Sequence, residues 1–118
     1  MLPINIKYDN NKVEQAFSDF SKMKKKHGED LTKQIKYRLD HLVAMPNFQE
    51  YLTLRLGNPH SLEGDLKGCY GVTASGNIRI IIKPICDALT QESLSKCDEV
   101  ILKGLCDYHG QKNKWIIP

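Results

Sequence analysis

Residues 70–84 read YGVTASGNIRIIIKP, and this stretch indicates the fold class. Apolar side chains occupy every second position on either side of a Ser-Gly-Asn segment, with Tyr70, Val72 and Ala74 before it and Ile78, Ile80 and Ile82 after it. Alternation with a period of two is typical of β-strands, and Gly-Asn chemistry is typical of tight turns. The stretch therefore predicts an antiparallel hairpin, whose second strand ends at Pro84.

Before the hairpin, the apolar residues follow the spacing of amphipathic helices. The predicted helices cover residues 13–26, 31–43 and 47–54, and a first strand covers residues 4–8. Asn10 is a suitable N-cap for the first helix, Gly28 is a suitable terminator for it, and Pro46 ends the second. Two amphipathic helices joined by a short glycine-containing link predict a helical hairpin that packs on the sheet.

After the hairpin, a polar segment precedes one more strand. Residues 85–97 predict a loop with a short helix at 91–96, and Val100, Leu102 and Leu105 mark a last strand that ends at 107–110. The order strand, helices, then strands predicts an α+β domain spanning residues 1–118, with helices on one side of a small, mainly antiparallel sheet. The tail at 112–118 carries the single tryptophan, Trp115, and we expect it to pack back on the sheet or to cover an edge.

Composition limits the classes of protein to consider. The chain has 118 residues, 41% of them hydrophobic and 26% charged, which is typical of one soluble domain and excludes disordered and collagen-like classes. Apolar runs are far shorter than a membrane span, and the N-terminus lacks the pattern of a signal peptide, so we expect no membrane contact and a cytoplasmic location. The four cysteines lack zinc-finger spacing, and we interpret them as reduced, mostly buried thiols rather than as a metal site.

Polar residues with useful chemistry occur in three segments. They are His60, Asp65 and Lys67 before the hairpin, Arg79 and Lys83 on its second strand, and Asp107, Tyr108 and His109 at the end of the last strand. Arg79 and Lys83 are four residues apart in a strand, so their side chains point to one face. We expect these groups to meet at one side of the sheet. The net charge of +3 is mild, and it neither requires nor excludes a phosphate-bearing partner.

Such a set suits RNA cleavage without a metal or cofactor. A base must take the proton of the ribose 2′-hydroxyl, an acid must protonate the leaving oxygen, and cations must stabilise the phosphate. Histidine serves as either acid or base near neutral pH, and an aromatic ring can stack on a nucleobase. Each residue also fits a plainer interpretation, since His60 lies in a polar loop, Arg79 and Lys83 fit the wet face of a strand, and 107–110 fits a turn.

Three motifs in order resemble the HigB-like branch of the RelE toxin superfamily. They are LEGDLKGCY at 62–70, SGNIRIII at 75–82 and DYH at 107–109. The resemblance covers residues 55–110, and it implies a small sheet with two N-terminal helices packed on one side. It also implies the toxin of a type II toxin–antitoxin system, a plasmid-maintenance protein that cleaves mRNA on the ribosome and inhibits translation.

The resemblance assigns roles to residues of this chain. His60 and His109 would transfer protons, and Asp107 would orient or assist the base. Lys67 and Arg79 would hold the scissile phosphate, with Lys83 as a further RNA contact, and Tyr108 would position or stack on a base. The implied partners are a HigA-like helix-turn-helix antitoxin and mRNA on the ribosome, with DNA contacted only through the toxin–antitoxin complex.

Two other functions remain open from the sequence. One is a module on the same fold that binds RNA or the ribosome without cutting. The other is a degenerate toxin that acts only through its antitoxin complex. Detecting new mRNA ends that depend on translating ribosomes separates the enzyme from both.

Overall fold

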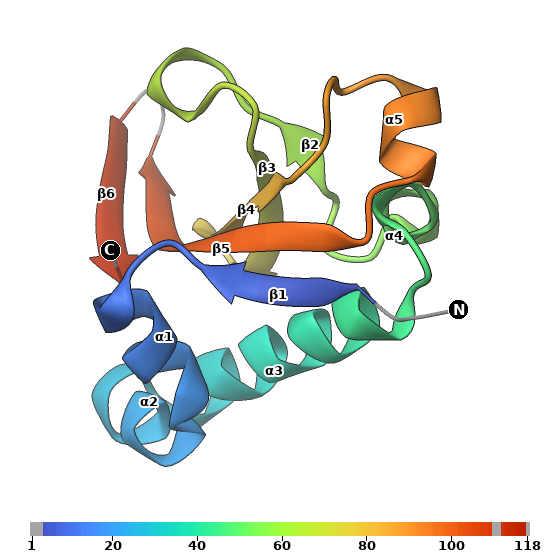
Figure 1. The fold of residues 1–118 in the computed structure, drawn as a ribbon. Coiled ribbons are helices and arrows are strands. Elements are labelled where there is room, and N and C mark those ends of the chain that lie inside the picture. Colours follow the sequence, from blue (N-terminus) through green and yellow to red (C-terminus); the bar gives the residue numbers. More distant parts are fainter. Residues whose placement is uncertain (1–3, 110–111, 118) are drawn as a thin grey trace.

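The computed structural model describes residues 4–109 and 112–117, except for the side chains of residues 109, 112 and 113. The elements run in the following order: β1 (Asn5–Tyr8), α1 (Asn11–Ser18), α2 (Phe20–His27), α3 (Glu29–Ala44), α4 (Phe48–Leu54), β2 (His60–Ser61), the 3-10 turn η1 (Gly64–Leu66), β3 (Tyr70–Ser75), β4 (Ile78–Pro84), α5 (Gln91–Ser95), β5 (Glu99–His109) and β6 (Lys112–Ile117). Figure 1 shows α1, α2 and α3 together against one side of the sheet.

The predicted hairpin forms the middle of the sheet. β3 and β4 pair antiparallel, with Val72 opposite Ile80 and Thr73 opposite Arg79, and β4 ends at Pro84. The strand order is β1-β5-β4-β3-β2, and β6 pairs with β5. Only β1 runs parallel to its partner, so the mainly antiparallel α+β fold predicted from the sequence is confirmed.

The last strand changes its partner halfway along. β5 pairs with β1 through residues 99–102 and with β6 through residues 105–109, and its register against β4 shifts between these two parts. Gly104 lies at this shift with φ of 141°, a backbone conformation that L side chains rarely adopt. A Cβ there would overlap the carbonyl oxygen of Ile117 and would approach Cζ3 of Trp115 to 3.2 Å. The expectation that the tail packs back on the sheet is confirmed, because it forms β6.

The first predicted helix is broken into two. Asp19 has non-helical backbone angles, ends α1, and caps α2 by accepting a hydrogen bond from the backbone N–H of Lys22 at 3.1 Å. A short acidic side chain competes in this way with the backbone for hydrogen bonds, which explains why the apolar stripe alone predicts one continuous helix. The predicted N-cap is confirmed, since Oδ1 of Asn10 accepts from the N–H of Val13 at 3.0 Å.

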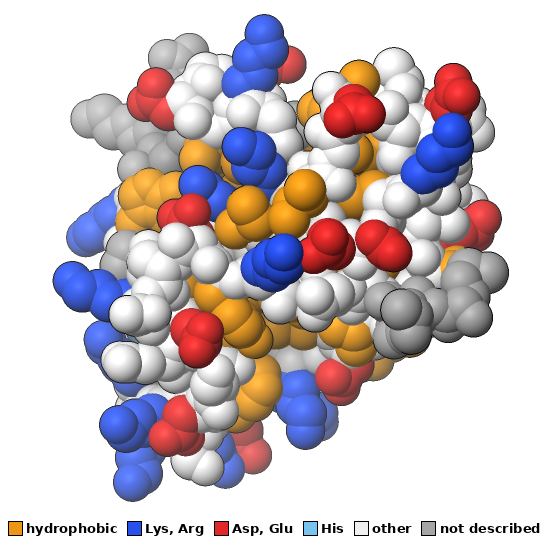
Figure 2. Space-filling model, viewed as in Figure 1, with side chains coloured by type: hydrophobic (Ala, Val, Ile, Leu, Met, Phe, Trp, Pro, Cys, Tyr) orange, Lys and Arg blue, Asp and Glu red, His pale blue; other side chains and the backbone are white. Residues whose placement is uncertain are grey.

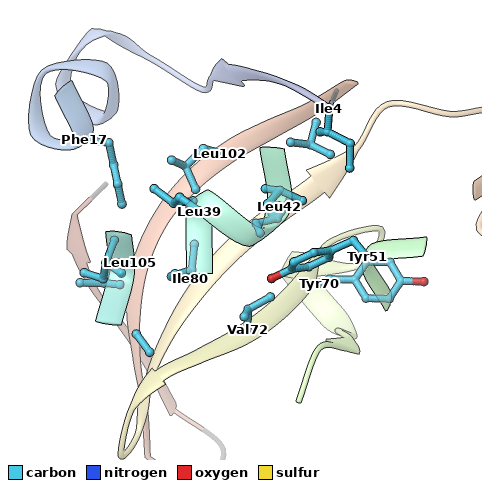
Figure 3. Packing of buried hydrophobic residues seen from close by; sticks show 14 of the residues in the cluster. Ile4, Phe17, Leu39, Leu42, Tyr51, Tyr70, Val72, Ile80, Leu102 and Leu105 are labelled. Atoms are coloured by element: carbon cyan, nitrogen blue, oxygen red, sulfur yellow. The ribbon is translucent and has the colours of Figure 1, made fainter. Parts of the chain in front are cut away.

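The main core lies between the helices and one face of the sheet. Figure 3 shows Leu39 and Leu42 of α3 facing Ile80, Leu102 and Leu105 of the central strands. All five are buried, and burying a leucine or isoleucine contributes about 1.5–3 kcal/mol each. This layer fixes which face of β4 and β5 points toward the helices, and it leaves the alternate residues on the opposite face.

A second, smaller cluster lies on that opposite face. Its buried members are Leu62, Leu66, Cys69, Ile81 and Cys106, and Tyr108 packs against them. The segment 62–69 therefore folds over the sheet and covers Ile81. It is held by backbone hydrogen bonds from Leu62 to Cys69 at 2.9 Å and from Cys69 to Leu66 at 3.0 Å. We call the side of the sheet that carries this cluster the open face, because no α-helix contributes to it.

The cysteines follow the pattern expected of reduced thiols. All four are free, and Cys69, Cys97 and Cys106 are buried while Cys86 is half-buried. Burial raises the pKa of Cys69, Cys97 and Cys106, because the thiolate loses its hydration. These three thiols are therefore structural groups of low reactivity.

Candidate nucleic-acid interface

The alternation along β4 puts the predicted basic residues on the open face. Ile80 and Ile82 pack in the main core, whereas Ile81 belongs to the second cluster. Arg79 and Lys83 share the side of the strand that Ile81 occupies. The prediction that these two residues point to one face is therefore met, although four residues of strand separate them by about 13 Å.

Arg79 and Tyr108 are neighbours at the hairpin end of this face. Arg79 pairs with Cys106, and Tyr108 lies two residues further along β5, which puts the two side chains about 7–8 Å apart on the diagonal. Nη1 of Arg79 donates to the carbonyl oxygens of Gly76 at 2.6 Å and Ile78 at 3.3 Å. Its Nε is buried and has no hydrogen-bond acceptor among the residues described.

Lys67 and Lys83 meet in a hollow at the other end of the open face. The hollow has a volume of about 480 Å³ and is lined by Asp9, Asn10, Asp65, Leu66, Lys67, Cys69, Lys83, Lys103 and Trp115. Both Lys67 and Lys83 are exposed, and neither forms an ion pair with any residue that the structure describes. Lys83 and Lys103 are close enough to Cys69 to oppose the rise in its pKa that burial causes.

His60 lies at the far edge of the same face. It is exposed on β2 opposite Gly71, its Nδ1 is 3.1 Å from the carbonyl oxygen of Asn58, and its Cε1 would lie 3.8 Å from a Cβ at Gly71. Two strand spacings and two residues separate it from Arg79, which amounts to roughly 12 Å between their Cα atoms. His60 therefore does not share a contact shell with Arg79 in this conformation.

The terminal motif is divided between the two faces. Asp107 pairs with Ile78, and side chains of paired residues lie on the same side of a sheet, so Asp107 points to the helix-covered side. Its neighbour Tyr108 packs on the second cluster of the open face. The backbone of His109 ends β5 opposite Lys112, and its side chain lies outside the described part of the structure.

The structure thus brings together two pairs of the predicted residues, Lys67 with Lys83 and Arg79 with Tyr108. Six residues of the hollow are absent from the predicted site: Asp9, Asn10, Leu66, Cys69, Lys103 and Trp115. Lys103 and Asp9 form an ion pair at 3.2 Å, although they are 94 positions apart in the sequence. Such a pairing has no local sequence signal. Trp115 stands out in the sequence as the single tryptophan, but the sequence predicts only that the tail packs on the sheet or covers an edge, and it predicts no binding role.

No site for a metal emerges from the described residues, since no three His, Cys, Asp or Glu side chains come together there. Within the same residues, no helix is both long and apolar enough to span a membrane. The open face offers lysine and arginine cations, the carboxylates of Asp9 and Asp65, an exposed histidine and the two aromatic rings of Tyr108 and Trp115.

Solved structures with a similar fold include toxins of Staphylococcus aureus. The YoeB–YefM complex matches with a TM-score of 0.52 and 20% identity, over 90% of this chain and 97% of that chain. The heterotetrameric YoeB–YefM toxin–antitoxin complex matches with a TM-score of 0.51 and 20% identity, over the same shares. The YoeB dimer matches with a TM-score of 0.54 and 15% identity, over 91% of this chain and 98% of that chain.

The chain has the fold of the YoeB toxin. This agrees with the RelE-like fold expected from the motifs, and it does not single out the HigB-like branch. No protein-family model matches the sequence, and no curated protein does. The likeness extends over at least 90% of this chain, whereas the motifs extend only over residues 55–110.

Proposed function

We propose that this chain is the toxin of a type II toxin–antitoxin pair in the RelE superfamily, and that it cleaves mRNA on the ribosome without a metal. One observation carries the proposal. On a fold shared with a solved toxin, the face free of helices holds Lys67, Arg79 and Tyr108, which lie in the motifs that resemble the superfamily, and Lys83, which directly follows the second motif.

The chemistry of the open face supports an RNA substrate. Arg79 is held by the hairpin turn, so little side-chain entropy is lost when its guanidinium contacts a phosphate. In the proposed reaction Arg79 holds the scissile phosphate, whereas Lys67, which the resemblance also assigns to that phosphate, lies with Lys83 at the other end of the face and contacts the flanking strand. Tyr108 positions a base, and His109 and His60 transfer protons with the help of Asp107.

The finer assignment to the HigB-like branch rests on the three sequence motifs. It implies a HigA-like helix-turn-helix antitoxin as partner, contact with DNA only through that complex, and a cytoplasmic location. Two of the three solved structures named above are complexes with YefM, so an antitoxin partner is a shared expectation of both branches. The neighbouring gene separates them, because a downstream helix-turn-helix protein supports the HigB-like arrangement.

Induced expression with and without the neighbouring gene tests the function. The wild-type chain should arrest growth, and Arg79→Ala should abolish the arrest while the far-ultraviolet circular dichroism spectrum stays unchanged. Lys36→Ala is the matched control, because Lys36 is an exposed cation on α3, at the helix-covered side of the sheet. Growth arrest by Arg79→Ala equal to that of wild type contradicts the assignment of the site.

A second candidate is a module that binds RNA or the ribosome without cutting. The division of the terminal motif favours it, since Asp107 points away from Arg79 and His60 lies two strands away. Mapping of mRNA 5′ ends distinguishes the two functions. New ends that appear only with translating ribosomes support cleavage, whereas stalled ribosomes without new ends support the binder.

A further inference from the structure

The single tryptophan of the chain lies on the open face, where β6 meets the centre of the sheet. Trp115 pairs with Cys106, a member of the second cluster, and its ring edge reaches over Gly104. Its side chain is nevertheless 40% exposed. An aromatic ring that is supported from below and open to solvent above is a platform for stacking.

Cations surround this ring. Trp115 lines the same hollow as Lys67, Lys83 and Lys103, which come from three different segments of the chain. In Figure 2 basic side chains and hydrophobic surface lie next to each other over β5 and β6, at the upper left of the view. Asp9 holds Lys103 at the rim, so Lys67 and Lys83 are the two cations of the hollow that form no ion pair with a described residue and can bind an anion.

The backbone next to the Trp115 ring adopts a conformation at residue 104 that is strained for any residue except glycine. Gly104 has a left-handed φ, and any Cβ there would collide with β6 beneath the ring. The lack of a side chain at Gly104 thus leaves room for the ring of Trp115, and the preceding residue, Lys103, pairs with Asp9 just after β1. A volume of about 480 Å³ is within the range of small-ligand pockets, which is roughly 300–1,000 Å³.

We propose that this hollow is a nucleotide subsite for single-stranded RNA, with a base stacked on Trp115 and its phosphate held by Lys67 and Lys83. Stacking on aromatic rings combined with a basic groove is the usual way in which proteins hold single strands. The proposal rests on the proposed function and adds a second contact to it. Because Lys83 lies about 13 Å along β4 from Arg79, the subsite binds RNA away from the scissile phosphate.

The position of Trp115 allows a direct binding measurement. The probe is an octamer of 2′-O-methyl uridine, which lacks the hydroxyl needed for cleavage. Titration of the protein should quench tryptophan emission to saturation, since Trp115 is the only tryptophan. Raising the salt concentration should weaken binding, because contacts to phosphates release counterions. Binding of a fluorescein-labelled octamer, followed by anisotropy, gives the affinity independently.

The variants separate stacking from folding. Trp115→Phe keeps a ring and should retain affinity within about threefold, while Trp115→Leu should lose about tenfold. Lys67→Ala and Lys83→Ala should each weaken binding and reduce its salt dependence. Lys36→Ala on α3 should bind as wild type does. Circular dichroism identifies any variant that fails to fold, and the two lysine variants keep the test decisive if Trp115→Leu does so.

The results that would overturn the subsite are different from the results that would overturn the toxin function. Anisotropy that shows binding without quenching, affinity unchanged in Trp115→Leu, or no binding at low salt overturns the subsite, even if the chain arrests growth. Saturable quenching of the wild-type emission, together with an anisotropy affinity that falls in Trp115→Leu and in both lysine variants, supports the subsite, even if no mRNA is cut.

Discussion

Replacing Gly104 with alanine tests whether the partner switch of β5 depends on the absence of a side chain. The residue has φ of 141°, and its missing Cβ would overlap the carbonyl oxygen of Ile117. Backbone cannot yield as a flexible side chain can, so β6 must move away from β5. We expect Gly104→Ala to fold with β6 displaced and with markedly lower stability.

The magnitude follows from two contributions. A non-glycine residue in a sparsely populated backbone region costs about 1–3 kcal/mol. Displacing the end of β6 exposes Ile117, which is 4% exposed in the structure, and uncovering an isoleucine costs about 1.5–3 kcal/mol. The sum is about 4 kcal/mol. With a urea dependence of about 1.5 kcal/mol per molar, the unfolding midpoint should fall by about 2.5 M.

Urea unfolding followed by circular dichroism measures this change, with Gly76→Ala as the matched control. Gly76 also has a positive φ, of 51°, but no atom lies within 4 Å of the position of a Cβ there. Its substitution should cost only about 1 kcal/mol. Emission from Trp115 should shift to longer wavelength in Gly104→Ala alone. Equal midpoints for the two variants would refute the steric argument.

Two further predictions concern buried polar groups. Burial raises the pKa of Tyr51 to about 12, and its hydroxyl has no partner among the described residues. Because an unfolded tyrosine ionises near pH 10, the free energy of unfolding should fall by about 1.4 kcal/mol between pH 8 and pH 11 from this group. Tyr51→Phe should remove that part of the pH dependence in urea unfolding without loss of stability at pH 8, and an unchanged slope would contradict the assignment. Among the thiols, Cys86 alone should react rapidly with a thiol reagent in the native protein, because the other three are buried, and all four should react in denaturant. Two results would show that the native state opens more readily than its packing implies. One is fast reaction of more than one thiol in the wild-type protein, and the other is fast reaction of any thiol in the Cys86→Ser variant.

The parts of the fold that were predictable are those that local chemistry specifies. The hairpin at 70–84 combines alternation with a Gly-Asn turn, and α3 combines an apolar stripe with a glycine before it and a proline after it. The N-cap Asn47 also begins α4 as expected, through a hydrogen bond to the N–H of Glu50 at 2.9 Å. In each case the signal and the element lie within a few residues of each other.

The parts that were not predictable depend on contacts distant in sequence. The parallel pairing of β1 with β5 joins Asn5 to Glu99, and the two-residue strand β2 exists only because β3 lies beside it. The same holds for β6, whose residues show little alternation of their own. The break at Asp19 is different, because its sequence signal is local. Asp19 is a capping residue, but the apolar stripe that continues on both sides of it predicts one unbroken helix.

The candidate site shows a similar division. Alternation along β4 correctly indicates that Arg79 and Lys83 share a face, but it says nothing of the 13 Å between them. Consecutive residues of a strand point to opposite sides, so a motif such as 107–109 is divided between two faces as soon as it is a strand. The sequence resemblance implies that the three residues of this motif act together at one site. Geometry instead gives Asp107 and Tyr108 different surroundings.

The second cluster links the fold to the proposed chemistry. Leu66 is buried in that cluster, and the next residue is Lys67, so burial of the leucine fixes the position of the lysine at the rim of the hollow. Ile81 lies between Arg79 and Lys83 and is the residue on which segment 62–69 rests. Each basic side chain of the open face is thus adjacent in sequence, or alternate along a strand, to an apolar residue held in place by packing. A small apolar cluster opposite the main core therefore has a purpose beyond stability, because it holds cations from separate segments on one surface.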